Sequence, residues 1–270
     1  MIPDRTSAAR QIEEVWRRLE QVNDPELDEP ITAMGFVERV VHAHDGSVRV
    51  DFRLPTYWCS PNFAFLMLDG VREALDSLSW SPAYQVTLHD HMFAEEVNKG
   101  IAGGKSFSAI FGELAGDEDL ESLHAIFRAK AFKRRQEAVL LGLRQKGLTD
   151  TEIARMDLSS FDAFFFDDAE AARQKPRYRQ ALLDRWPDQR QDDAVFLTWE
   201  GDRIEVESLD AYLADLRSVR INMEFNGALC RGLKHTRYKE MNIVDGEPTL
   251  VDFIAGRVPA RTDTTHTSCN

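Results

Sequence analysis

The chain has 270 residues, of which 43% are hydrophobic and 10% aromatic, an ordinary composition for a packed globular protein with one large domain or two modest ones. Its 46 acidic residues outnumber 33 Lys and Arg, and the net charge of −13 argues against nucleic-acid binding, which needs a basic footprint. The longest apolar stretch, residues 63–68, is far shorter than the roughly 20 residues of a membrane helix. The N-terminal residues lack the pattern of a secretory signal, so we expect a cytoplasmic protein without nucleic-acid or membrane partners.

Residues 1–91 alternate between helical and strand-like hydrophobic patterns. Asp24-Pro25 predicts the end of a first helix, because a residue before proline avoids helical geometry. Asp45-Gly46 is a typical hairpin turn between two alternating segments. This order predicts a small α/β domain in which both helices cover one face of the sheet. The predicted elements are a helix over 6–22, strands over 36–42 and 47–54, a helix over 61–78 and a strand over 83–89.

After His91 the pattern becomes mainly helical, so the predicted fold class is α+β. We expect three parts: an N-terminal domain over 1–91, a helical domain over 92–190, and a small α+β segment over 191–270 whose end is flexible. Glu200-Gly201-Asp202 predicts the turn of a C-terminal hairpin. The other predictions are helices over 93–98, 106–114 and 119–146, hairpin strands over 194–199 and 203–206, and a helix that begins over 209–216.

Several motifs in the N-terminal part occur in a characteristic order. They are the Asp-Pro-Glu-Leu run at 24–27, Ile31, the Met-Gly-Phe-Val run at 34–37, and Cys59 after the second strand. This segment resembles the PaaD-like and SufT-like iron–sulfur cluster assembly family. The family usually has Thr-x-Pro-x-Cys-Pro at the cysteine, whereas here Pro55 takes the place of the threonine, Thr56 follows it, and Ser60 separates Cys59 from Pro61. The resemblance implies the small α/β fold and places the acidic run near the cysteine.

Cys59 falls at a strand-to-helix junction, where partial positive charge and free amide groups favour a thiolate that can bind metal. The alternative is that it fills a joint in the core as a small apolar residue. Asp24 and Glu26 either supply oxygen ligands and orient the thiol, or form local hydrogen bonds in a turn. The other cysteines, Cys230 and Cys269, are widely spaced and there is no CxxC motif, so cysteines of one chain do not predict a closed metal site.

A second group of potential metal ligands comprises His89, His91 and Glu95. If a helix begins near His91, then His91 and Glu95 share one face, and imidazole with carboxylate suits iron or zinc. The alternative is an exposed acidic helix start with solvated histidines.

Residues 128–146 carry seven Lys or Arg against one acid, Glu137. This basic stripe predicts a solvated face or a protein interface rather than a DNA reader, because the next segment is aromatic and acidic. In that segment, Phe164-Phe165-Phe166 cannot all point one way on a helix, so at least one should be exposed.

The leading functional hypothesis is an accessory or maturation factor, rather than an enzyme, that helps a client metalloenzyme acquire an iron or iron–sulfur centre. The resemblance implies a bacterial multicomponent monooxygenase, of the propane monooxygenase type, as the source of a diiron client. Cys59, Asp24 and Glu26 would hold the cargo transiently, and a homodimer or the client would complete the ligand set. The alternatives are a metal-dependent enzyme that uses His89, His91 and Glu95, and a metal-free chaperone that binds the client.

Overall fold

The computed structural model describes residues 5–112, 120–237, 243–244 and 247–248 of an α+β protein. The N-terminal elements follow the predicted order of helix, hairpin, helix and strand. Their ends differ from the predicted ends by a few residues, which is the usual uncertainty for element boundaries. They are α1 (Arg5–Leu19), β1 (Val37–His42), β2 (Val48–Arg53), α2 (Pro61–Asp76) and β3 (Tyr84–His89).

The three strands form one sheet in the order β1-β2-β3. β1 and β2 are antiparallel and meet at Gly46, whose φ of +86° is a conformation that glycine adopts without strain. β2 and β3 are parallel, and α2 makes the crossover between them. Side chains of β2 alternate, with Val50 and Phe52 fully buried and Asp51 only partly covered. One sheet face is therefore packed and the other is polar.

A first hydrophobic core joins this sheet to the helices that follow it. α1 packs against β1 and α2, and α3 (Ala94–Ala102) packs against β3. α4 (Phe107–Phe111) adds Phe107 and Phe111 to the same core. The first core thus extends beyond residue 91, the end of the predicted N-terminal domain, although the predicted division of the chain into three parts stays a prediction.

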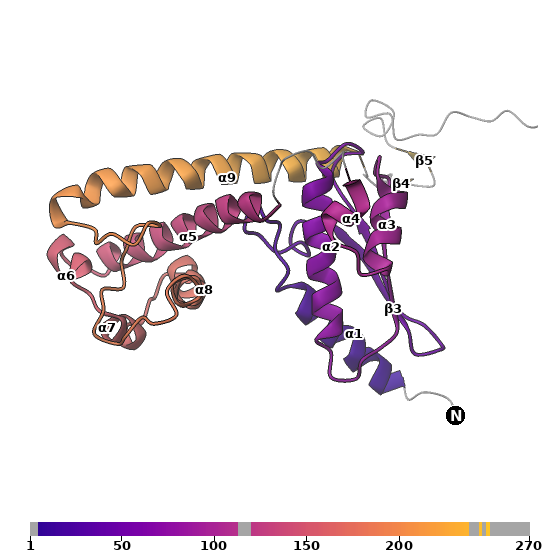
Figure 1. Ribbon diagram of the computed structural model, residues 1–270, viewed down its shortest axis with the longest axis horizontal. Helices are drawn as coiled ribbons and strands as arrows, with labels where there is room; N and C mark the ends of the chain where they lie inside the picture. Colours follow the sequence, from indigo (N-terminus) through magenta and orange to yellow (C-terminus); the bar gives the residue numbers. More distant parts are fainter. Residues whose placement is uncertain (1–4, 113–119, 238–242, 245–246, 249–270) are drawn as a thin grey trace, which may run out of the picture.

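A second core lies in the helical extension and contains residues from Phe132 to Leu216. α5 packs against both α8 and α9. Figure 1 shows α5 leading away from the N-terminal elements and α9 returning alongside it, so that the end of α9 lies near the sheet. The extension contains α5 (Leu120–Gln145), α6 (Asp150–Ala154), α7 (Leu158–Ala163), α8 (Ala169–Arg185), a 3-10 turn (Val206–Ser208) and α9 (Leu209–Arg237).

α9 is much longer than the segment over 209–216 that the sequence predicted as its beginning. Its apolar residues are divided between a face on the second core and exposed positions, so no single stripe marks its full length. Within the described parts of the chain, neither this helix nor any other is both long and apolar enough to span a membrane.

The predicted hairpin over 194–206 is wrong, because the structure has only a single bridge there, between Leu197 and Arg203. The backbone of this segment finds other partners: Val195 N–H donates to Met156 O at 3.0 Å, and Gln136 Nε2 donates to Leu197 O at 2.8 Å. A short strand pair, β4 (Ile243–Val244) and β5 (Glu247–Pro248), follows α9 instead. The predicted flexible end of the chain lies outside the described residues.

The aromatic run after α7 has the predicted division between buried and exposed rings. Phe165 is 84% exposed, whereas Phe164 and Phe166 pack against the second core.

Candidate functional site

Cys59 lies in the loop between β2 and α2, directly before Ser60 and the first helical residue, Pro61. Its Sγ is 3.0 Å from Thr56 Oγ1, a hydrogen bond in which either group can be the donor. The thiol is free and only partly buried at the edge of the first core. The loop therefore presents sulfur at the N-terminus of a helix, as the sequence predicted, without enclosing it in the core.

Exposed apolar side chains surround this loop. Trp58 is 73% exposed, Tyr57 47% and Met92 46%. The N–H of Met92 donates to Tyr57 O at 2.9 Å, which joins the loop after β3 to the cysteine loop. Exposed aromatic and methionine side chains are enriched at protein contact surfaces. The thiol thus lies beside an apolar surface suited to contact with another protein.

His91 fixes the backbone of the cysteine loop. Its ring is buried; Nδ1 accepts from Phe93 N–H at 3.2 Å, and Nε2 lies 2.8 Å from Cys59 O. Because Nδ1 accepts, Nε2 carries the proton and donates to the carbonyl. Burial lowers the pKa of His91, and the hydrogen bond to Cys59 partly opposes this. His91 is therefore a neutral histidine with both ring nitrogens engaged.

Asp24 lies in the acidic loop, the name used here for residues 24–29. Its Oδ1 accepts from the N–H groups of Glu26 and Leu27, both at 2.9 Å, so it forms the local turn that the sequence allowed. Burial raises the pKa of Asp24 to about 6 although these hydrogen bonds lower it, and the charges of Glu26 and Glu29 add to the rise. Asp24 is thus a buried carboxyl group that shares its loop with the other predicted oxygen ligand, Glu26.

α9 brings a second thiol to this region. Cys230 lies near the C-terminal end of α9 and is partly buried against the first core. The pKa of Cys230 is raised to about 11, first by burial and then by electrostatic interaction with Asp24, Cys59 and Glu26, whereas Arg231 lowers it. The structure therefore places Cys230 within electrostatic reach of all three ligands predicted around Cys59.

Asp28 connects the acidic loop to the helical extension. It is only 3% exposed, and its carboxylate accepts from Arg135 at 2.6 and 2.8 Å and from Arg177 at 2.9 Å. Arg134 also donates to Leu27 O at 3.1 Å. Part of the basic stripe over 128–146 is therefore an interface with an acidic segment of the same chain.

The residues of the second predicted metal group have separate partners. His89 Nε2 contacts Asp51 Oδ1 at 2.9 Å on the polar sheet face, and exposed Glu95 pairs with Lys99 at 2.6 Å. His91 is engaged with the cysteine loop as described above. Among the described residues, no group of three or more His, Cys, Asp and Glu side chains is arranged to hold a metal ion. Metal binding by His89, His91 and Glu95 stays a prediction.

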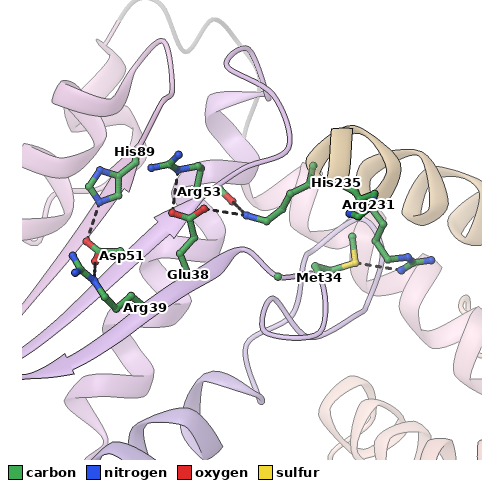
Figure 2. A pocket seen from close by; sticks show the side chains of 10 residues that line it. Met34, Glu38, Arg39, Asp51, Arg53, His89, Arg231 and His235 are labelled. Carbon is green, nitrogen blue, oxygen red and sulfur yellow. Dashed lines mark hydrogen bonds and ion pairs between the residues drawn. The ribbon is translucent and has the colours of Figure 1, made fainter. Parts of the chain in front are cut away.

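A pocket of about 710 Å³ lies between the polar sheet face and the end of α9 (Figure 2). Its charges are joined in short chains: Asp51 lies between Arg39 and His89, and Glu38 lies between Arg53 and Lys234. Arg231 pairs with Glu29, outside the lining, so each Lys or Arg of the pocket has an acidic partner. The lining residues are Met34, Gly35, Glu38, Arg39, Asp51, Arg53, His89, Arg231, Lys234 and His235.

Residues 12–88 match the family model described as iron–sulfur cluster assembly protein. The matched segment runs from α1 to the end of β3 and contains Asp24, Glu26 and Cys59, but neither His91 nor Cys230. The N-terminal part of this chain is thus similar to iron–sulfur cluster assembly proteins over the matched segment; it is called the assembly domain below, and a long helical extension follows it. Neither the search of curated proteins nor the search of solved structures gave a match.

The thiol of the matched segment could be identified from the sequence, whereas the position of Cys230 beside the first core could not. In the sequence, Cys230 is only a cysteine near Asn226 and several charged residues, and no recognisable motif there indicates a functional site. The signal that identifies it is tertiary, namely the contact between the end of α9 and the acidic loop.

Proposed function

We propose that this protein is an accessory factor that helps a client metalloenzyme acquire an iron or iron–sulfur centre. The observation that carries the proposal is a free, partly exposed thiol at the N-terminus of α2, within the segment that matches the assembly family. Cys59 would bind the iron cargo as a thiolate, with Asp24 and Glu26 beside it as oxygen ligands or orienting groups. Fewer than four protein ligands suit a carrier, because a closed structural site retains its metal.

The apolar rim formed by Tyr57, Trp58 and Met92 supports direct contact with the client. A contact surface next to the thiol would bring the acceptor ligands to the cargo and exclude water during transfer. The finer proposal, which rests on the family resemblance, is that the client is the diiron hydroxylase of a bacterial multicomponent monooxygenase. Localisation in the cytoplasm and action as a homodimer belong to the same proposal.

Anaerobic reconstitution tests the role of Cys59. The full chain is incubated with ferrous iron and sulfide, desalted, and assayed for protein-bound iron and sulfide. We expect bound iron in the wild type, its loss in Cys59→Ser, and its retention in Cys269→Ser, which changes a cysteine outside the described residues. Equal iron in all three proteins, or no iron in any of them, would refute the carrier role.

A second variant separates client contact from iron binding. Trp58→Ala removes the most exposed aromatic side chain of the rim without changing a ligand. We expect this variant to bind iron as the wild type does but to transfer it more slowly to the apo form of a diiron hydroxylase. Unchanged transfer would show that the rim does not contact this client.

A further inference from the structure

The last turns of α9 contact the acidic loop on both sides of Cys230. One turn before the cysteine, Asn226 Nδ2 donates to Glu26 Oε1 at 3.3 Å. Directly after it, Arg231 Nη1 donates to Glu29 at 2.6 Å and contacts Met34 Sδ at 3.4 Å. Polar contacts therefore set both the position and the rotation of this helix segment on the N-terminal unit.

This rotation turns Cys230 toward the first core. Asn226 and Cys230 are four residues apart and share one helix face. Cys230 packs against the core cluster that Cys59 also contacts, and its neighbours on the exposed side, Leu229 and Leu233, are 53% and 41% exposed. The thiol therefore lies between α9 and the unit that carries Cys59.

We propose that Cys230 is a second sulfur ligand for the iron cargo, so that the cargo binds between Cys59 of the assembly domain and α9 of the extension. This inference rests on the proposed function of Cys59 and extends it to a residue outside the matched segment. On binding a divalent ion, each thiol exchanges its S–H bond for an S–metal bond and releases one proton to solvent.

Two sulfur ligands explain how the site can be both specific and temporary. Thiolates prefer iron, zinc and cuprous ions over hard cations such as magnesium. The described residues hold no group of three or more ligands, so further positions on the metal would remain open for sulfide or for ligands of the client. The acceptor could then displace the two protein thiolates one after the other.

The second core keeps α9 in place for this role. Arg220 Nε donates to Glu137 at 2.8 Å, and Tyr212 OH donates to Gln136 at 2.6 Å, so side chains of α9 bind two buried polar residues of α5. The proposed cargo site thus depends on the extension, because α9 carries one of its two sulfur ligands.

Anaerobic titration with Co²⁺ alone tests the pair, because thiolate-to-cobalt absorption reports the number of sulfur ligands. We expect Cys230→Ser and Cys59→Ser each to halve this absorption and to weaken binding at least as much as the ~10- to 100-fold loss caused by removing a supporting residue around a metal. Proton release, followed by an indicator, should be about two per ion in the wild type and about one in either variant. Cys269→Ser is the matched control and should bind as the wild type does.

The outcomes separate the two proposals. If Cys59→Ser loses half of the absorption and Cys230→Ser loses none, the cargo binds without Cys230 and this inference fails, while the proposed function of Cys59 stands. If neither variant differs from the wild type, both fail, and a loss confined to Cys269→Ser would assign binding to the C-terminal segment. Circular dichroism and Cys230→Ala provide a second measurement, because a folded alanine variant with full absorption would also overturn the inference.

Discussion

The contact between Asp28 and two arginines predicts that one carboxylate couples the assembly domain to the helical extension. Asp28 lies in the acidic loop, whereas Arg135 and Arg177 belong to α5 and α8, whose packing forms the second core. Asp28→Asn is the appropriate change, because Asp28 has a φ of +54° and asparagine tolerates this conformation. The variant therefore removes the charge without adding backbone strain.

Loss of one partner from a buried ion pair typically costs about 3–5 kcal/mol, because the remaining charge stays desolvated. The side chains of Arg135 and Arg177 are 17% and 23% exposed, so water would partly solvate their charges after the carboxylate is removed. We therefore expect Asp28→Asn to lower the free energy of unfolding by about 3 kcal/mol, the lower end of that range. This loss of stability should mainly weaken the interaction between the first and the second core, rather than the packing within either core.

Urea unfolding followed by tryptophan fluorescence and by circular dichroism measures this effect. Coincident transitions in the wild type should separate in Asp28→Asn if the two cores unfold independently. Asp167→Asn is the matched control, since it removes an exposed ion pair with Lys146 that is worth at most about 1 kcal/mol. An equal and small effect of the two substitutions would refute the proposed coupling, as would a double-mutant cycle between Asp28 and Arg135 with no interaction energy.

Three further predictions concern buried groups. The pKa of Asp24 rises from 3.8 to about 6 on folding, so ionising its carboxyl group above pH 6 lowers the free energy of unfolding by about 3 kcal/mol. The free energy of unfolding of Asp24→Asn should therefore increase by that amount relative to the wild type as the pH rises from about 4 to above 6. A difference that does not vary with pH would refute the assignment. Arg220→Met leaves the Glu137 carboxyl group buried and without its ion-pair partner. We expect the free energy of unfolding, measured with urea, to fall by about 3 kcal/mol at neutral pH. The difference should diminish in acid, because burial already raises the pKa of Glu137 and the carboxyl group becomes protonated. Gly142→Ala places a Cβ 2.5 Å from the methyl carbon of Ala171 in α8 and should lower the free energy of unfolding by ~1–3 kcal/mol. Gly232 has open space around it, so Gly232→Ala should raise the free energy of unfolding by ~0.5–1 kcal/mol. A thermal unfolding experiment that ranks the two variants in the opposite order would contradict this packing.

The fold of the N-terminal unit follows from local sequence signals. The turn at Gly46, the alternation of β2 and the proline at the first position of α2 each determine the conformation of residues within a few positions of them, so each signal can be recognised in the sequence. The thiol of Cys59 could be placed at the helix start for the same reason. The hairpin over 194–206 was predicted wrongly because its alternating pattern reflects burial against α7 and α8. Backbone groups of this segment bind side chains of the helices instead of a partner strand; for example, Tyr178 OH of α8 donates to Val195 O.

The contacts of α9 could not be predicted from local patterns. Residues 217–237 are mostly exposed, and no helical stripe shows which of their faces meets the first core. What orients the segment is a set of single polar contacts with residues about 200 positions earlier, such as Asn226 with Glu26 and Arg231 with Glu29. A sequence pattern has no signal for such pairs, because either member is also an ordinary surface residue.

The acidic loop shows why the extension is relevant to the chemistry of the assembly domain. Within six residues, Asp24 shapes the local turn, Glu26 and Glu29 contact α9, and Asp28 contacts α5 and α8. A change in the position of the extension must therefore move the loop or break these contacts. A client that binds α9 and the rim around Cys59 together would act on both sulfur atoms at once, so recognition of the client and release of the cargo would be coupled through this loop.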